Sequence, residues 1–237
     1  MSTVSRRLFQ WHRWLAWLVG IQLVIWVTSG IVFAWLPFEP WVKAGDQLQR
    51  PVLALTHLPP GLDDLPADKV RSLSAVTTPR GAAWRVQLAG QPKAQYRLVD
   101  GTPWAAPDAE LVRSFARTLV RGQAPITGVT RLAEVPRRLL IVDETGGRGD
   151  LWRVDFDDAL GTRVYLDGEG GDLVAIRNEA WVAYDFLWRL HIMDYRGGED
   201  FNNKLLRLAS AAAWLMAAAG AVLAVFALRR TFRRKRA

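Results

Sequence analysis

The chain of 237 residues contains no cysteine. This absence excludes a disulfide framework, a thiol nucleophile, an iron–sulfur cluster and covalently attached c-type haem. An oxidising compartment is compatible with such a sequence. Any folded domain there must be stabilised by its hydrophobic core.

Charged residues are absent from two long stretches of the chain. No charge interrupts residues 14–38, and none interrupts residues 208–228. A helix needs about 20 apolar residues to cross a hydrocarbon core of roughly 30 Å. We therefore predict two transmembrane helices, at residues 13–38 and 205–228.

Acidic residues are absent from both ends of the chain. The first acid is Glu39 and the last is Asp200, whereas arginines precede the first apolar run and a basic tail follows the second. Because basic residues are retained on the cytoplasmic side, both termini are predicted to be cytoplasmic. Residues 1–12 then form a cytoplasmic N-terminus, residues 39–204 a periplasmic region, and residues 229–237 a cytoplasmic tail.

A cleaved signal peptide is the alternative interpretation of the first apolar run, because Val32 and Ala34 have the small-residue spacing of a cleavage site. The run is longer than the usual apolar segment of about 7–15 residues, and it contains several tryptophans. We favour a retained anchor, with Trp35, Phe38 and Trp41 as an aromatic belt at the outer surface.

The net charge of +8 has a topological explanation. Ten of the 31 lysines and arginines lie at the two ends and at the start of the second apolar run, so the middle of the chain is nearly neutral. A nucleic-acid interface needs a basic patch on a folded domain, whereas a short basic tail suits anionic lipid head groups. We expect the lipid bilayer as a partner, and no nucleic acid.

The middle of the chain contains two similar segments. Trp84-Arg85-Val86 is followed by an Asp-Gly pair at residues 100–101, and Trp152-Arg153-Val154 by another at residues 167–168. Each segment is typical of a strand, a polar turn, a second strand and a closing turn. We interpret them as parts of a duplicated unit. A coincidental similarity between two hairpins is the alternative.

Helical spacing of apolar residues predicts a helix before each hairpin, at residues 67–73 and 108–120. A further strand is expected at residues 173–177. The predicted fold class is α+β, with tandem units at about 50–106 and 107–178, each a helix packed on an antiparallel sheet. The proline-rich residues 51–66 are interpreted as a linker or an extended loop.

Residues 179–195 form a predicted helix with an aromatic face. The residues on that face are three or four apart; they are Trp181, Tyr184, Trp188, His191 and Tyr195. Such a helix close to a membrane span either rests on the bilayer surface or docks on the core of the domain.

Several short motifs together resemble those of PepSY-associated transmembrane proteins. They are Arg6 to Ala16 at the start of the first span, Thr28-Ser29-Gly30 late in it, Tyr165-Leu166-Asp167 with Gly171 to Val174, and Leu190-His191. This resemblance implies a bacterial inner-membrane protein with small periplasmic PepSY units between its spans. Some members carry b-type haem between their helices, including reductases of ferric siderophores. Others accompany flavin-based electron carriers, and others are non-catalytic modules.

The resemblance implies His12 and His191 as candidate haem ligands. His12 precedes one end of the first span and His191 follows the other, and the ends of a span are roughly 30 Å apart. One chain therefore cannot place both histidines on one haem. A homodimer mate or another membrane subunit would have to supply the second ligand.

Small residues in both apolar runs predict faces at which helices approach closely. They are Ala16 and Gly20 in the first run, and Ala213, Ala217, Gly220, Ala221 and Ala224 in the second. Gln22 is a polar residue within the first run, where an amide commonly makes an interhelical hydrogen bond.

Three functions fit these patterns. The first is a non-catalytic accessory subunit of a membrane redox or electron-transfer system. The second is an intrinsic haem-b electron carrier similar to ferric reductases. The third is a periplasmic binding or inhibitory module with no redox role. No hydrolase or nucleotide-binding motif is present in the sequence.

The charge pattern makes the predicted topology testable with alkaline phosphatase, which is active only outside the cytoplasm. A fusion at Gly90 should be active and a fusion after Ala237 inactive, because the basic ends are retained inside. The reverse pattern would show that this topology is wrong.

Overall fold

The computed structural model describes residues 3–43, 48–49 and 65–234. The chain divides into two compact units, one made of residues 1–36 with 185–237, the other of residues 37–184. Most of the predicted linker at 51–66 lies outside the described residues.

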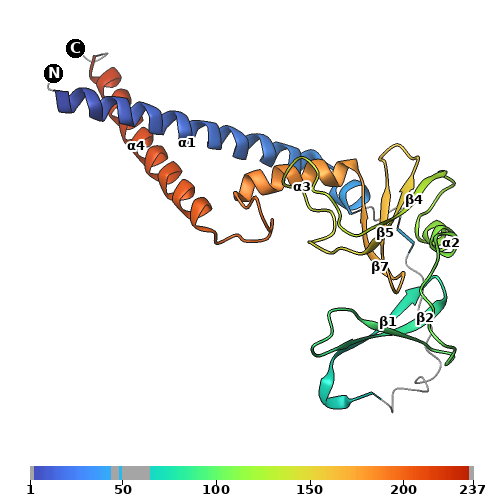
Figure 1. Ribbon diagram of the computed structural model, residues 1–237. Coiled ribbons are helices and arrows are strands. Elements are labelled where there is room, and N and C mark those ends of the chain that lie inside the picture. The colour runs from blue at the N-terminus through green and yellow to red at the C-terminus, as the bar shows by residue number, and fades with distance from the viewer. Residues whose placement is uncertain (1–2, 44–47, 50–64, 235–237) are drawn as a thin grey trace. The chain divides into compact units, whose positions relative to one another are not determined.

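The first sheet of the 37–184 unit has three antiparallel strands in the order β1-β2-β3 (Figure 1). They are β1 at Val70–Thr78, β2 at Gly81–Leu88 and β3 at Gln95–Leu98. The helix predicted at 67–73 is wrong, because only Ala67–Lys69 forms a short 3₁₀ turn before β1 begins. The β-branched residues Val76, Thr77 and Thr78 favour the strand, which pairs with β2 along its length.

The second sheet has four antiparallel strands in the order β4-β5-β6-β7. They are β4 at Ile126–Leu132, β5 at Leu151–Phe156, β6 at Arg163–Asp167 and β7 at Leu173–Arg177. Helix α2 at Ala109–Leu119 precedes them. Asp108 caps this helix, since its carboxylate accepts hydrogen bonds from the amides of Glu110 and Leu111. The predicted helix at 108–120 and the predicted strand at 173–177 are thus present.

The main core lies between α2 and one face of the second sheet. Val112, Ala116 and Leu119 of α2 are buried against Val154 and Val164 of the sheet. Burial of one such valine or leucine side chain contributes about 1.5–3 kcal/mol to the stability of the fold. This arrangement is the predicted helix on an antiparallel sheet, and it gives the unit an α+β fold.

The two hairpins share topology and strand register. β1 shifts register against β2 between Val70 and Ser72, and β4 shifts against β5 at the corresponding place, between Ile126 and Gly128. An arginine faces a tyrosine in both pairs that follow, Arg85 with Tyr96 and Arg153 with Tyr165. A shared bulge supports the interpretation of a repeated unit, because bulges are specific features of a family of sheets. In the first repeat, which contains β1, β2 and β3, the described residues include no helix that covers the sheet as α2 does.

Trp84 and Trp152 occupy equivalent places in the two hairpins, and both side chains are half-buried. Their indole N–H groups are buried and have no hydrogen-bond partner among the described residues. The two tryptophans are therefore only partly buried, and the indole nitrogen belongs to the buried part of each ring.

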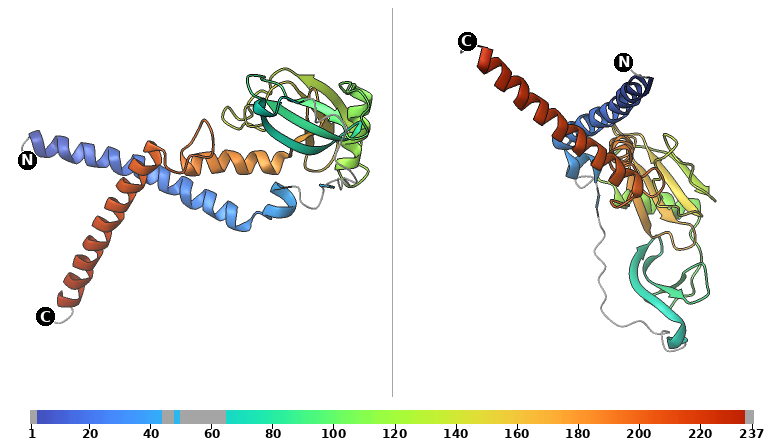
Figure 2. Two further views of the ribbon diagram at one scale, coloured as in Figure 1. Left: turned by 90° about the horizontal axis from the view of Figure 1, so that it is seen from below. Right: turned by 90° about the vertical axis from the view of Figure 1, so that its left-hand side faces the viewer.

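Three helices belong wholly or partly to the other unit. They are α1 at Thr3–Trp35, α3 at Glu179–Ile192 and α4 at Lys204–Arg234. Helices α1 and α4 cross each other and then diverge (Figure 2). α4 is helical across the predicted second span, although its side chains after Ala221 lie outside the description.

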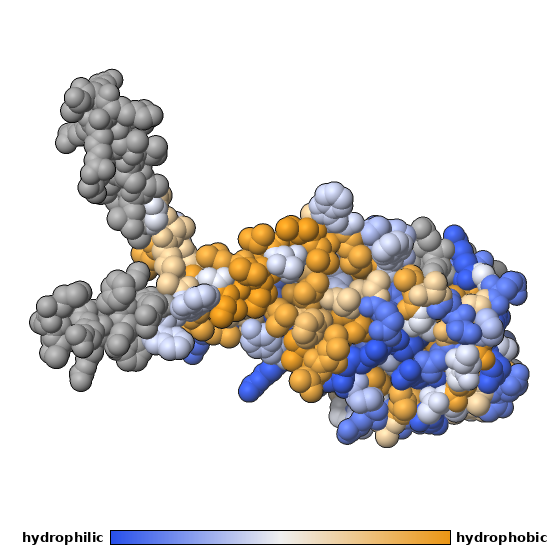
Figure 3. All heavy atoms as spheres, turned by 90° about the horizontal axis from the view of Figure 1, so that it is seen from above, coloured by the Kyte–Doolittle hydropathy of each residue, from blue (hydrophilic) through white to orange (hydrophobic). Residues whose placement is uncertain are grey.

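One described helix segment, Ala16–Trp35, is long and apolar enough to cross a membrane, as a membrane anchor or as a signal sequence. Its side chains are largely uncovered, with Trp17 66 % and Val24 65 % exposed. Figure 3 shows hydrophobic side chains gathered along the helices. Apolar surface of this extent needs lipid or another protein to cover it.

A buried ion pair connects the loop before β5 to strand β6. Glu144 is 2 % and Arg163 5 % exposed, and their side chains approach to 2.7 Å. Tyr165 donates a hydrogen bond of 2.9 Å to the second carboxylate oxygen of Glu144. The Arg163 guanidinium also bonds to Glu179 at the start of α3. These contacts satisfy both buried charges, as their desolvation requires.

We predict that Glu144→Gln destabilises the protein by about 3 kcal/mol, because it leaves the buried Arg163 charge poorly compensated. Urea unfolding of the full chain in detergent, followed by tryptophan fluorescence, measures this change. Glu39→Gln is the matched control, since Glu39 pairs with Lys43 at a carboxylate that is 71 % exposed. Its effect should stay below about 0.5 kcal/mol. Equal effects of the two changes would contradict the assignment of a buried ion pair.

Candidate functional site on helices α1 and α3

The C-terminal part of the aromatic face of α3, at Trp188 and His191, packs on α1. The Phe33 ring lies 5.9 Å from the Trp188 ring and 5.6 Å from the His191 ring, measured between centroids. Trp26 lies 6.4 Å from His191. Neither expected position of this helix, on the bilayer surface or on the domain core, included α1 as a neighbour. α3 ends at Ile192, three residues before its predicted end, so Tyr195 lies beyond the helix.

His191 is held at its ring and at its backbone. Its Nδ1 atom lies 2.7 Å from the Oγ atom of Ser29, which is fully buried. Its carbonyl accepts a hydrogen bond of 2.7 Å from Nε1 of Trp26. Burial lowers the pKa of His191 below its ordinary value, so the imidazole is neutral at pH 7. A neutral imidazole is the form that can bind a metal or accept a proton.

Side chains form hydrogen bonds to backbone carbonyls at the end of α3 that have no partner within the helix. Helix ends leave their last four carbonyls without intrahelical partners. Gln22 donates to the carbonyl of Leu190 at 3.5 Å, and Asn203 donates to that of Ile192 at 2.9 Å. The interhelical hydrogen bond predicted for Gln22 is therefore present. Such caps suit a helix end from which water is excluded.

Two functional residues, Ser29 and Trp26, were not among the predicted site residues. Their spacing contains the missing signal, because Gln22, Trp26 and Ser29 are four and three residues apart and so share one face of α1. A serine and an indole N–H beside a glutamine make a stripe of hydrogen-bonding groups in an apolar helix. A stripe of this kind predicts a polar partner on a neighbouring helix.

His12 is not brought to this site. It lies on α1, but its side chain is outside the description. The continuous helix separates it from Ser29 by about 25 Å, at about 1.5 Å per residue. His57 also lies outside the described residues. His191 is thus the histidine that the described structure places in a packed site.

The small residues are mostly uncovered. Ala213 is buried and Ala16 and Gly20 are half-buried, whereas Ala217, Gly220 and Ala221 are exposed, and the side chain of Ala224 lies outside the description. A methyl group added at Gly20 or Gly220 would meet no described atom within 4 Å. The described part of the chain therefore makes no close helix approach at either glycine.

A second polar site joins the two sheets of the 37–184 unit. Tyr96 of β3 donates a hydrogen bond of 2.7 Å to Asp172, which Arg85 also approaches at 3.4 Å. Burial and the Asp172 charge raise the pKa of the Tyr96 phenol, so it stays protonated. Burial also raises the pKa of Asp172, against the opposing effect of the Tyr96 hydrogen bond.

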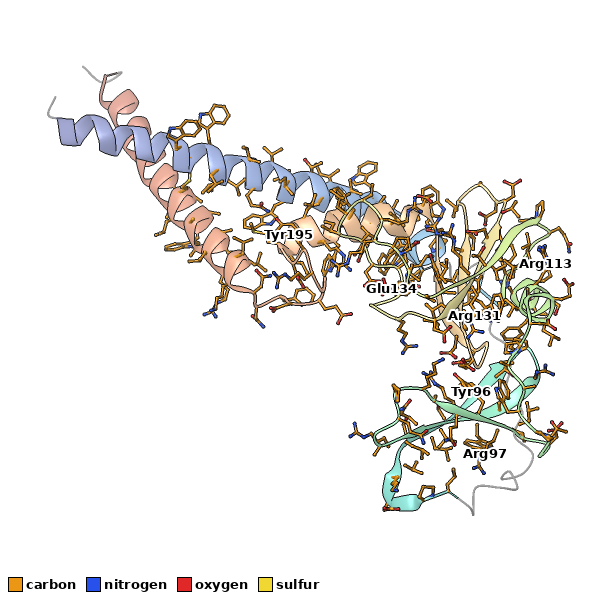
Figure 4. The ribbon with its side chains drawn as sticks, viewed as in Figure 1. Tyr96, Arg97, Arg113, Arg131, Glu134 and Tyr195 are labelled. Carbon is orange, nitrogen blue, oxygen red and sulfur yellow. The ribbon has the colours of Figure 1, made fainter. Side chains whose placement is uncertain are left out.

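The exposed part of this junction is a network of four charges. Lys93 lies 2.9 Å from both Asp150 and Glu169, and Arg131 pairs with the same two acids. Figure 4 shows Tyr96 and Arg131 on the two sheets that meet here. A cavity of about 310 Å³ opens beside the network. Because each acid is matched by a base, the cavity wall has no strong preference for an anion or a cation.

The acidic residues near the turn between β6 and β7 form no metal-binding cluster among the described residues. In the described parts of the chain, no three histidine, aspartate or glutamate side chains lie close enough together to hold a metal ion. Asp167 instead accepts hydrogen bonds from the amides of Glu169 and Gly170, as turn aspartates commonly do.

No family model matches the chain, and neither a curated protein nor a solved structure is significantly similar to it.

We predict that Tyr96→Phe costs about 1–3 kcal/mol of stability, because the buried Asp172 carboxylate loses its closest donor. Tyr195→Phe is the matched control, since this ring is 38 % exposed and its hydroxyl bonds to no described residue. Thermal unfolding of the full-length variants in detergent measures both. A loss no larger than that of Tyr195→Phe would show that the hydrogen bond does not hold the sheets together.

Proposed function

We propose that this protein is a PepSY-like protein of the bacterial inner membrane and a non-catalytic accessory subunit of a membrane redox or electron-transfer system. The observation that carries the proposal is the site of His191. One oriented imidazole lies between aromatic side chains, against a helix of membrane length. A site with one such group can complete a partner's cofactor site, and it does not form a catalytic site alone.

The proposed topology has two spans, with both termini in the cytoplasm and the sheets in the periplasm. The segment Ala16–Trp35 and the length of α4 support it, together with the basic ends of the chain. The uncovered faces of α1 and α4 at Gly20 and Gly220 support contact with helices of another subunit or of a second copy.

The PepSY-like character rests on the second sheet with its helix. Helix α2 followed by four antiparallel strands has the helix-on-sheet architecture that the resemblance implies. The first sheet repeats the strands and the bulge without a described α2 counterpart. We regard the two as a repeated unit whose members share the strand order and the bulge.

His191 could provide one ligand to haem b. When bound, haem supplies one-electron transfer. His191 would use Nε2, because Nδ1 is already bonded to Ser29. The ring contacts described for His191 are with Trp26, Phe33 and Trp188, and none of these side chains is a haem ligand. The second ligand would come from another chain.

Two alternatives remain distinct from this proposal. An intrinsic haem-b carrier would need the second ligand within the isolated chain or its homodimer, which then binds haem without other subunits. A binding or inhibitory module without a redox role would use the junction cavity beside Lys93 and Glu169. Reduced-minus-oxidised absorption spectra distinguish the proposed function from these two alternatives.

We expect a b-type haem signal in reduced-minus-oxidised spectra when the protein is co-purified with its membrane partners. His191→Ala should lower that signal, because it removes the proposed ligand. His57→Ala is the matched control, and His12→Ala tests the ligand predicted at the other face. A signal unaffected by His191→Ala would remove this residue from the proposal. A signal in the isolated chain would favour the intrinsic carrier, and none in any preparation would favour the binding module.

A further inference from the structure

We infer that Ser29 is a positioning residue that holds His191 in the tautomer with the proton on Nδ1, which leaves the Nε2 lone pair as the reactive atom of the site. The use of that lone pair by a cofactor rests on the proposed function. The tautomer itself depends only on the hydrogen bonds between α1 and α3.

The hydroxyl of Ser29 has one hydrogen and three close polar neighbours, two of them backbone carbonyls. Its Oγ atom lies 2.7 Å from the carbonyl of Ile25, 3.2 Å from that of Trp26 and 2.7 Å from Nδ1 of His191. Two oxygens at 2.7 Å repel each other unless a hydrogen lies between them. A backbone carbonyl has no hydrogen to give, so the hydroxyl hydrogen must point to Ile25.

The same argument then fixes the proton on the ring. Once the hydroxyl hydrogen is bonded to Ile25, Oγ can only accept in its contact with Nδ1. An unprotonated Nδ1 at 2.7 Å would place two lone pairs against each other. Nδ1 therefore has the proton, and since a neutral imidazole has a single N–H, Nε2 has none in that form.

The ring is also fixed in orientation. Trp188 is nearly parallel to it, with 5° between the planes, and Phe33 meets it edge to face. The hydrogen bond from Trp26 to the His191 carbonyl holds the backbone beside it. No described residue makes a hydrogen bond to Nε2. The site thus presents one unshared lone pair whose direction is set by packing.

Such a lone pair suits an electron-accepting ligand. Histidines that bind metals usually donate their other ring N–H to an oxygen, which orients the ring and raises its basicity. Ser29 supplies that oxygen here. The chemistry of the site therefore favours a transition-metal centre, haem iron included, or a strong hydrogen-bond donor. Loss of such an oxygen commonly lowers metal affinity about 10–100-fold.

Nitrogen NMR of the full-length protein in detergent tests the tautomer without any cofactor. The chain has three histidines, so ¹⁵N-histidine labelling gives few signals, and His191→Ala assigns the relevant pair. We expect the wild-type His191 signals to show a protonated Nδ1 and an unprotonated Nε2. Ser29→Ala should shift the ring towards protonated Nε2, and Ser29→Thr, which keeps the hydroxyl, should retain the wild-type pattern.

Thr28→Ala is the matched control, because it removes the adjacent hydroxyl of the same helix, which is exposed. It should leave the His191 signals unchanged. A wild-type His191 with protonated Nε2 would overturn the inference, and so would a Ser29→Ala spectrum identical to the wild type. Should Ser29→Ala fail to fold, the wild-type spectrum and Ser29→Thr still decide the question. The expected tautomer without haem in any preparation would sink the proposed function and leave this inference standing.

Discussion

The contact between Ser29 and His191 is the interaction on which the helical unit depends. α1 is apolar, and a second helix packed on it needs polar contacts to define its position, because apolar faces alone permit many registers. Ser29, Trp26 and Gln22 supply these contacts, and they end at the capped terminus of α3. The hydrogen bonds that hold the helices together also orient the one imidazole of the described site, so anchoring and chemistry share the same residues.

In the unit of residues 37–184, buried polar pairs likewise connect elements that are apart in the sequence. Arg163 and Glu144 are buried as a pair, and Tyr96 and Asp172 meet where the two sheets join. In each case a buried polar group is satisfied by a partner far away in the sequence, and removal of one partner would leave the other without compensation. The core of α2 on the second sheet supplies the bulk of the apolar burial, whereas these polar pairs define which elements meet.

Sequence patterns predicted the hairpins, α2 and β7, because alternation, helical spacing and an Asp cap are local signals. They failed at residues 67–73, where pairing with β2 outweighs a weak helical pattern. They placed His191 and Trp188 on one face of a helix but did not identify their neighbours on α1, since an aromatic stripe shows that a helix has a buried face without showing which element covers it. Ser29 entered the sequence analysis only as part of the Thr28-Ser29-Gly30 motif, without a role of its own. Its spacing with Gln22 and Trp26 indicates a polar face on α1, and its distance to Nδ1 of His191 identifies the partner of that face.

Cross-linking in native membranes tests most directly whether α3 packs on α1. The chain has no cysteine, so Phe33→Cys with Trp188→Cys places a unique thiol pair where the two rings are 5.9 Å apart. A short bifunctional maleimide should join them and keep the two halves together after cleavage at a protease site inserted between residues 50 and 64. The pair Trp14→Cys with Trp188→Cys should not cross-link, because Trp14 lies about 28 Å from Phe33 along α1. Equal cross-linking of the two pairs, or none in either, would contradict the account.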